Sequence, residues 1–380
     1  MAFNKYTSAS MIVVPSGYKA TKLYAQVPTD GDGDMTVTRA SSKTRVNSSS
    51  LVETITANVP ALDYSLSSCP ALALDPAATN LLLQSQDFTT TWSSLVGSSV
   101  TAKTTVSPNG GTDADTLSFG AGPASSLSQT VTMSISTAYT FSVWAKVASG
   151  TQDFQLTYWD GSTLNSSSDF TATTDWQRFE YTFTTSASHT GEAVRIKKDA
   201  AGATTSLIIW GAQLELGSHA TGYIPTTTLA VARSADAVTL ASIITNGIIG
   251  ASTGTILING KINAESGNIN LFRLSDGTVN NRITVLNVAI QATTGGIAAT
   301  VANSLTSDAD GYFDGKIAIR WNGTNVRVYR NGSAIGNANF TAGASLTSFE
   351  LNGKNDTSWI REVIFYDSDL GDTDMATITT

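Results

Sequence analysis

The sequence predicts an all-β protein, because short runs of alternating apolar and polar residues recur along it and no long segment keeps a helical apolar period. The clearest example is residues 316–332, where two alternating runs are each followed by Asn-Gly. Ile317, Ile319 and Trp321 fall on one face of the first run, and Asn-Gly supplies the positive φ angles that tight turns need. We therefore expect a β-meander there.

Length and composition indicate more than one domain. The chain has 380 residues, of which 14% are charged and 41% hydrophobic, so Ser, Thr, Asn and Gly supply most of its polar groups. We expect an irregular N-terminal segment (residues 1–78) followed by two tandem antiparallel β-sandwich (jelly-roll) domains, residues 79–228 and 229–380. The N-terminal segment has too few apolar residues to fold alone, so it should lean on a partner chain or on the next domain.

Turn residues separate the expected strands of both sandwiches. In the first sandwich we expect strands at residues 126–133, 139–147, 154–159, 176–184, 193–197 and 206–216. In the second we expect strands at residues 255–262, 270–274, 282–286, 315–321, 325–330, 348–351 and 360–366. The last residues of the chain should form a short helical turn.

The charge distribution argues against a nucleic-acid partner, because the formal net charge is -8 and no basic stripe is visible. Arg195, Lys197 and Lys198 share one strand-like run, which we interpret as a solvated face. We expect no membrane insertion, because no stretch is long and apolar enough, and the run at residues 11–14 is too short for a secretion signal. Cys69 lies in an apolar segment, where we expect a small buried side chain.

A string of short motifs runs through the first 82 residues, at positions 28–34, 38–41, 44–47, 51–53, 62–64, 69–70 and 79–82. This string resembles the N-terminal module of many phage tail-fibre and head-decoration proteins. The resemblance implies that the N-terminal segment attaches the chain to other virion proteins.

Further motifs lie in the two expected sandwiches. Residues 141–146, 176–179, 209–217 and 220–226 resemble jelly-roll carbohydrate-binding modules, and residues 233–236 and 360–366 are similar to concanavalin-like or laminin-G-like sandwiches. The resemblance implies glycan binding, and calcium is a cofactor that it leaves open. Such sandwiches also serve as spacers and trimerisation surfaces.

Candidate glycan-binding residues are those that combine a flat aromatic ring with polar groups. Tyr158, Trp159 and Asp160 lie at the end of an expected strand, where side chains can be exposed. Because adjacent residues point to opposite faces, only one of the two aromatic rings should line a given surface. Trp144 and Trp210 lie in mid-strand among apolar neighbours, so we expect them in the core.

Catalytic and metal sites find little support in the sequence. It contains two histidines, no phosphate-binding loop and no zinc-ligand spacing, so we predict a protein that is not an enzyme. A hydrolytic pair drawn from Asp160, Glu180, Glu215 and Asp276 stays open. Asp30, Asp32 and Asp34 have the odd-position spacing of a calcium loop, although a polar hairpin turn is favoured.

These observations favour a non-enzymatic bacteriophage structural protein, exposed at the virion surface and made in the host cytoplasm. Its N-terminal segment would bind the particle, as a tail fibre or a capsid decoration, and its sandwiches would bind glycans of the host or its surroundings. A homo-oligomer, most simply a trimer, would shield the N-terminal segment and multiply weak sugar sites. The alternatives are a tail-borne glycan depolymerase and a purely structural decoration that binds no sugar.

Overall fold

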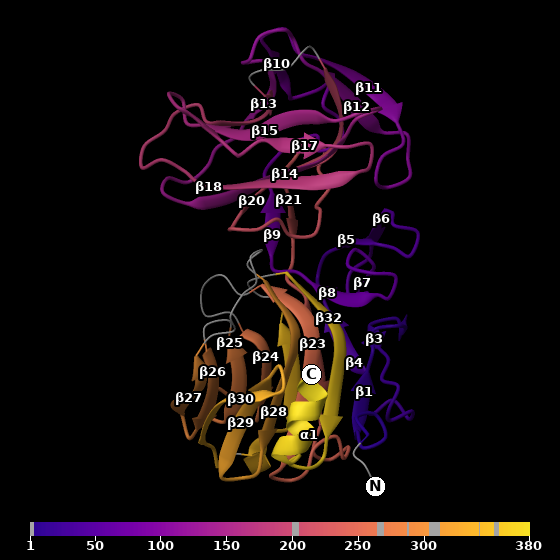
Figure 1. Cartoon of the computed structure of the whole chain (residues 1–380), viewed down its shortest axis with the longest axis vertical. Helices are drawn as coiled ribbons and strands as arrows, with labels where there is room; N and C mark the ends of the chain where they lie inside the picture. Colours follow the sequence, from indigo (N-terminus) through magenta and orange to yellow (C-terminus); the bar gives the residue numbers. More distant parts are fainter. Residues whose placement is uncertain are drawn as a thin grey trace. The chain divides into compact units, whose positions relative to one another are not determined.

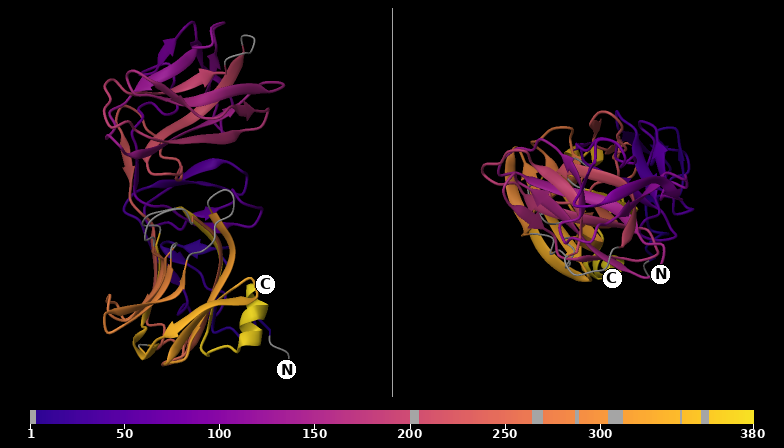
Figure 2. Two further views of the ribbon diagram at one scale, coloured as in Figure 1. Left: turned by 60° about the vertical axis from the view of Figure 1, so that its left-hand side comes forward. Right: turned by 90° about the horizontal axis from the view of Figure 1, so that it is seen from above.

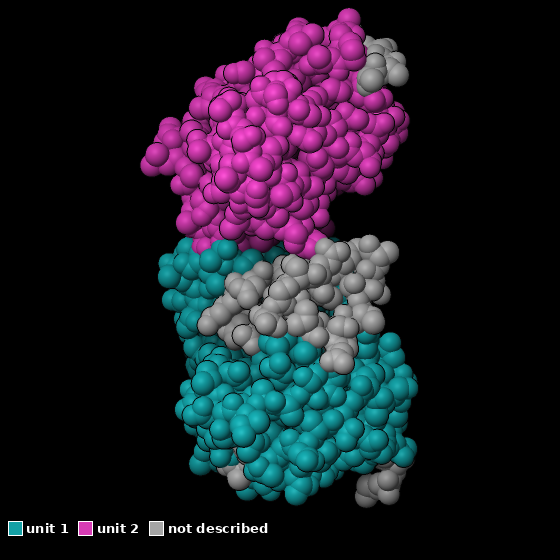
Figure 3. Space-filling model, turned by 90° about the vertical axis from the view of Figure 1, so that its left-hand side faces the viewer, with its two compact units in different colours: residues 1–49, 54–77, 234–380 teal, residues 50–53, 78–233 magenta. Residues whose placement is uncertain are grey.

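The computed structural model describes residues 4–199, 205–263, 270–286, 289–303, 312–341, 343–352 and 357–380. Antiparallel strands dominate it, which confirms the all-β fold class (Figure 1). The chain forms two compact units, shown in different colours in Figure 3. Unit 1 comprises residues 1–49, 54–77 and 234–380, and unit 2 comprises residues 50–53 and 78–233.

Unit 2 is a sandwich of a six-stranded and a five-stranded sheet, and its two layers are visible in Figures 1 and 2. The six-stranded sheet has the order β10 (Ser93–Leu95), β13 (Ser126–Thr130), β19 (Ala193–Lys198), β15 (Gln152–Trp159) and β16 (Leu164–Ser166), with β17 (Phe170–Ala172) also pairing with β15. The five-stranded sheet has the order β11 (Ser99–Thr105), β12 (Ala114–Ser118), β20 (Ser206–Leu216), β14 (Ala138–Lys146) and β18 (Gln177–Thr184). A separate pair joins β9 (Ala78–Asn80) to β21 (Val231–Arg233).

Unit 1 contains two larger sheets. One has the order β30 (Ser333–Asn339), β29 (Asn325–Arg330), β28 (Tyr312–Trp321), β23 (Gly254–Asn263), β32 (Ser358–Tyr366), β8 (Ala71–Leu74) and β7 (Leu62–Asp63), with β1 (Met11–Val13) also pairing with β32. The other has the order β2 (Tyr18–Lys19), β3 (Lys22–Leu23), β4 (Met35–Thr38), β22 (Ala237–Ala241), β31 (Ser348–Asn352), β24 (Asn270–Ser275), β25 (Arg282–Leu286), β26 (Ala289–Thr294) and β27 (Ile297–Asn303). The remaining elements are β5 (Lys43–Val46), β6 (Val52–Ile55), a 3-10 turn (Gly343–Ser345) and the helix α1 (Asp372–Thr379).

The predicted meander is confirmed in β28, β29 and β30. Ile319 pairs with Val328 and Trp321 with Val326, and all four side chains are buried. Asn331 and Gly332 have φ angles of 48° and 74°, as the tight turn between β29 and β30 requires. The predicted helical turn is also present as α1, which packs near β28 and β29 (Figure 1).

The N-terminal segment differs from the expectation, because it belongs to the same unit as the C-terminal sandwich. We expected residues 1–78, 79–228 and 229–380 to be three consecutive parts, yet β1 and β8 both pair with β32, and β4 pairs with β22. The physical reason is burial. The short N-terminal strands cannot cover their own apolar side chains, and Met11, Val13 and Leu72 reach the core by extending sheets built from the end of the chain.

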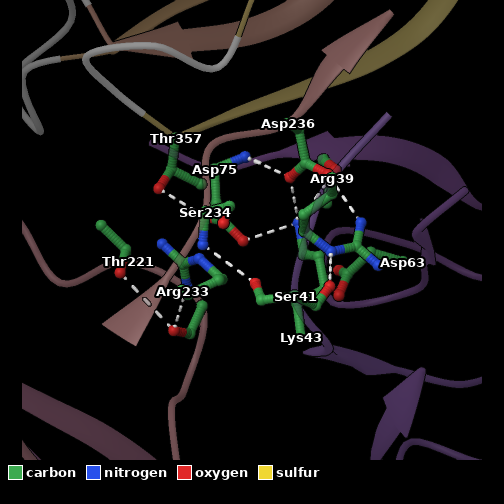
Figure 4. Close-up of polar contacts among 12 residues, drawn as sticks. Arg39, Ser41, Lys43, Asp63, Asp75, Thr221, Arg233, Ser234, Asp236 and Thr357 are labelled. Carbon is green, nitrogen blue, oxygen red and sulfur yellow. Dashed lines mark hydrogen bonds and ion pairs between the residues drawn. The ribbon is translucent and has the colours of Figure 1, made fainter. Parts of the chain in front are cut away.

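A buried network of four charges ties the N-terminal segment to the strands that follow unit 2 (Figure 4). The Asp236 carboxylate accepts from Arg39 Nη1 at 2.7 Å and from Lys43 Nζ at 2.8 Å, and Lys43 Nζ lies 2.7 Å from the Asp75 carboxylate. The Thr357 hydroxyl donates to Asp75 at 2.8 Å. Each of the four charged side chains is at most 2% exposed, so two cations and two anions neutralise one another inside unit 1.

Cys69 is exposed, contrary to the buried position that we expected, because it lies in a turn-rich stretch between β7 and β8. Helix α1 has eight residues, and the described ranges contain no helix with the length and apolar character needed to cross a bilayer.

We predict that Asp236→Asn lowers the free energy of unfolding of unit 1 by about 3–5 kcal/mol, because Arg39 and Lys43 then stay buried with too little negative charge. Calorimetry and urea denaturation of the full chain measure this loss. Asp32→Asn is the matched control, since Asp32 is exposed in a turn and its loss should change stability by less than about 0.5 kcal/mol. An Asp236→Asn protein that unfolds like the wild type would contradict the stabilising role.

Candidate functional site

Strand β15 places Tyr158 and Trp159 on opposite faces of the six-stranded sheet. Tyr158 points into the core of unit 2, where it is fully buried and its ring stacks on Phe183 with centroids 4.5 Å apart and planes 10° apart. Burial raises the pKa of the Tyr158 phenol. No ligand can reach this ring from solvent, so Tyr158 is removed from the predicted glycan-binding residues.

Trp159 lies half-buried on the outer face of the sheet. The guanidinium of Arg195 lies over its ring, 4.8 Å from the centroid. Arg195 is on β19, the strand next to β15, and its backbone pairs with Thr157. The stacked pair therefore joins two neighbouring strands, as expected for a cation over an aromatic face.

Three more side chains complete what we call the Trp159 face: Gln155 and Thr157 of β15 and Lys197 of β19, together with Trp159 and Arg195. Gln155 pairs with Lys197 in register, and Lys197 Nζ donates to Gln155 Oε1 at 3.2 Å. Gln155 Nε2 in turn donates to Asp169 at 2.7 Å. Thr157 is fully buried beneath these side chains, so the face presents an aromatic ring, two cations and an amide on two adjacent strands.

Asp160, the third predicted residue, closes the turn that follows β15. Its carboxylate accepts from the backbone N–H groups of Thr163 at 2.6 Å and Ser162 at 2.8 Å, and from the Ser186 hydroxyl at 2.9 Å. These hydrogen bonds hold the pKa of Asp160 well below its usual range, the bond from Thr163 most of all. Asp160 therefore positions the chain beside Trp159 in an Asx-type turn.

Sequence reasoning missed Arg195 as a partner of Trp159, because the two are 36 positions apart and only strand pairing brings them together. It assigned Arg195, Lys197 and Lys198 to one solvated face. Strand alternation splits them, since Lys198 is buried at 1% exposure and pairs with Phe154, while Arg195 and Lys197 point outward. The only signal available was this period of two.

A second aromatic cluster covers the outer face of the five-stranded sheet. Trp144, Trp210 and Tyr223 contact one another with ring centroids 4.9–5.4 Å apart, and Arg178 lies over Trp144 at 4.5 Å. Trp210 and Tyr223 are nearly inaccessible, so Trp210 is buried as expected, although on the outer face of its sheet. Trp144, which we expected to be in the core as well, is only half-buried. Tyr223 belongs to the chain segment after β20, so this cluster is covered by the protein itself.

Glu215 lies buried on the same outer face, within the motif 209–217. Its carboxyl group accepts from Gln213 and from the backbone and hydroxyl of Thr221, all within 2.9 Å. Burial is the largest influence and raises the pKa of Glu215. These contacts fasten the segment that carries Tyr223, and Glu215 itself is fully buried.

The other carboxylates considered for hydrolysis also have structural partners. Glu180 accepts from the Ala220 N–H at 3.1 Å, and Asp276 accepts from the backbone and hydroxyl of Thr278. Asp160 belongs to the six-stranded sheet of unit 2, Glu180 and Glu215 to the five-stranded sheet, and Asp276 to unit 1.

The aspartates of the possible calcium loop act as turn residues. Asp30 accepts from the backbone N–H of Asp32 at 3.0 Å, and Asp34 accepts from that of Ala25 at 2.8 Å. Across the residues that the structure describes, no group of three or more acidic, histidine or cysteine side chains is arranged to hold a metal ion. Calcium binding therefore has no assigned ligands.

Comparison with known protein families gives no match for this chain, and comparison with curated proteins gives none either. Among solved structures, the binding domain of botulinum neurotoxin DC in complex with rat synaptotagmin II matches 38% of this chain and 40% of its own, with 17% identity and a TM-score of 0.30. A CBM22-1 xylan-binding domain from Paenibacillus barcinonensis Xyn10C matches 39% of this chain and 96% of its own, with 12% identity and a TM-score of 0.29. A CBM4 structure matches 28% of this chain and 72% of its own, with 14% identity and a TM-score of 0.24. Scores of this size support no inference about the ligand of this chain.

We predict that Tyr158→Ala lowers the free energy of unfolding of unit 2 by about 3–5 kcal/mol, because it empties a fully buried aromatic position. Trp159→Ala should lower it by about 1 kcal/mol or less, since this ring is half in solvent and packs mainly under Arg195. Urea denaturation of the two variants makes the comparison. Equal losses would contradict the opposite placement of the two rings.

We predict a pH-dependent effect for Glu215→Gln. Because the fold raises the pKa of Glu215 above its ordinary value of about 4.3, the group contributes stability below that value and loses it as pH rises through the raised pKa. The variant, which is always neutral, should therefore gain stability relative to the wild type as pH rises from about 4 to 8. Thermal unfolding across this range measures the difference, and a constant difference would contradict the raised pKa.

Proposed function

We propose that this chain is a non-enzymatic protein of a bacteriophage particle that binds glycans through the Trp159 face. The observation that carries the proposal is the half-buried Trp159 ring under the Arg195 guanidinium, on an outer sheet face that also presents Gln155 and Lys197. A pyranose ring has an apolar side that packs on an indole and hydroxyl groups that need donors and acceptors at its edge. The Trp159 face offers both kinds of contact on two rigid strands.

The virion part of the proposal is supported by the N-terminal motifs, which resemble those of tail-fibre and head-decoration proteins. Residues 4–77 lie largely within unit 1, with β1, β4 and β8 built into its sheets. Attachment to other virion proteins would then involve unit 1 as a folded body. A trimeric assembly and a position at the virion surface stay predictions of the same proposal.

Glycan binding by unit 2 would be weak at a single site, because the Trp159 face is an open sheet surface with one aromatic platform. Several copies on one particle would raise the effective affinity through multivalency. The need for several copies fits a particle-bound protein, and an isolated monomer should bind glycans with low affinity.

Two other functions remain as competing proposals. A depolymerase would need two carboxyl groups facing one sugar, and the four candidate acids are held in separate structural contacts. A purely structural decoration would leave Trp159 and Arg195 without a ligand. Binding and turnover measurements separate the three.

We predict that the full chain binds an array of bacterial surface polysaccharides and that Trp159→Ala weakens this binding roughly 30-fold, the effect of losing a hot-spot residue worth about 2 kcal/mol. Trp176→Ala is the matched control, because Trp176 is another half-buried tryptophan of unit 2 with a cation, Lys146, over its ring at 5.1 Å. It should bind as the wild type does.

Three outcomes would count against this function. Release of reducing ends from a bound polysaccharide would favour the depolymerase. An array without any signal would favour a structural decoration. Loss of binding in Trp176→Ala but not in Trp159→Ala would place the glycan on another surface.

A further inference from the structure

Within the described residues, Arg195 has no counter-ion, unlike Arg39, Arg273 and Arg320. Its guanidinium lies over Trp159, and within the described residues it makes no hydrogen bond or ion pair. Arg39, Arg273 and Arg320, by contrast, each lie 2.6–2.8 Å from a carboxylate oxygen. The positive charge of Arg195 is therefore left uncompensated by the described part of the fold.

This arrangement is unfavourable for the free protein. Burial lowers the pKa of Arg195, and no neighbouring carboxylate opposes the shift. The ordinary pKa of arginine lies above about 12, so the guanidinium still carries its charge at neutral pH. It has lost part of its hydration and gained only an aromatic face in return, and a bound anion would offset that loss.

Lys197 adds a second positive charge on the same face, two residues further along β19. Its Nζ contacts Gln155 Oε1 and the carbonyl oxygen of Lys198, both at 3.2 Å and both uncharged. The negative charge of Asp169 is linked to Lys197 indirectly, because the Gln155 side chain accepts from Lys197 and donates to the Asp169 carboxylate. Positive charge thus gathers along β19 on a chain whose formal net charge is -8.

We propose that the Trp159 face is built for an acidic glycan, one whose sugar rings carry an anionic group, and this inference rests on the proposed glycan-binding function. The part of the Trp159 ring that Arg195 leaves exposed packs on the apolar side of an acidic sugar, and the Arg195 fork binds its anionic group through two parallel hydrogen bonds. Lys197 attracts a second anionic group further along the polymer. Carboxylate and sulfate share this chemistry.

Paired polymers that differ only in charge test the inference. The full chain is titrated with polygalacturonate and its carboxyl-reduced form, and with dextran sulfate and dextran. We expect the charged member of at least one pair to bind about tenfold tighter or more, as a charge-assisted bidentate contact provides. The carboxylate pair and the sulfate pair together show which anionic group the site accepts.

Variants of Arg195 then test whether this residue causes the preference for the charged polymer. Arg195→Gln should bind both members of a pair equally, and Arg195→Lys should keep part of the preference, because it keeps the charge but loses the fork. Arg361→Gln is the matched control: it removes a half-buried arginine of unit 1 that pairs with Asp314, and it should leave binding unchanged. Arg195→Gln should unfold at the same temperature as the wild type or a higher one, because it removes an unpaired cation.

The outcomes separate this inference from the function on which it rests. Equal binding of both members of both pairs, lost in Trp159→Ala, would leave glycan binding in place and overturn the acidic preference. No binding of any of the four polymers by the wild-type chain would overturn both. A marked fall in the unfolding temperature of Arg195→Gln would show that Arg195 is structural and would also overturn the inference.

Discussion

Each strand of a two-layer sandwich offers a side chain only two places, the interior or the outer face of its sheet, and the order of residues decides which. In β15 this constraint sends Tyr158 onto Phe183 in the core and Trp159 to the outer face. In β19 it buries Lys198 and turns Arg195 outward, one strand away from Trp159. The candidate site is a direct product of this alternation, because its residues come from two strands paired in one register.

Charge is handled in opposite ways in the two units. In unit 1 two cations and two carboxylates meet in the interior, and every charge has a partner within 2.8 Å. In unit 2 Arg195 is partly buried and has no carboxylate partner among the described residues, which is a less stable arrangement for the free protein. Ligand-binding surfaces often contain such locally unfavourable arrangements. The missing carboxylate partner distinguishes Arg195 from Arg39, Arg273 and Arg320, which form ion pairs within the fold.

The two aromatic clusters of unit 2 also differ in what covers them. On the five-stranded sheet, Tyr223 and the buried Glu215 belong to contacts that close the outer face with the chain's own residues. On the six-stranded sheet, Trp159 is half-buried, and the Arg195 side chain lies over its ring. The motif 209–217, which resembles carbohydrate-binding modules, thus supports the fold of the unit, and the half-buried Trp159 lies on the other sheet.

The sequence by itself determined the all-β class, the meander near Trp321, the burial of Trp210 and the rule that Tyr158 and Trp159 cannot share a face. These features are local, because they depend on alternation and on turn residues that act over a few positions. Only the tertiary structure decided that Met11 and Leu72 enter a core made by the end of the chain, that Asp236 neutralises Arg39 and Lys43, and that Arg195 covers Trp159. Each of these depends on which strands pair across long stretches of sequence, and a period of two carries no information about the partner.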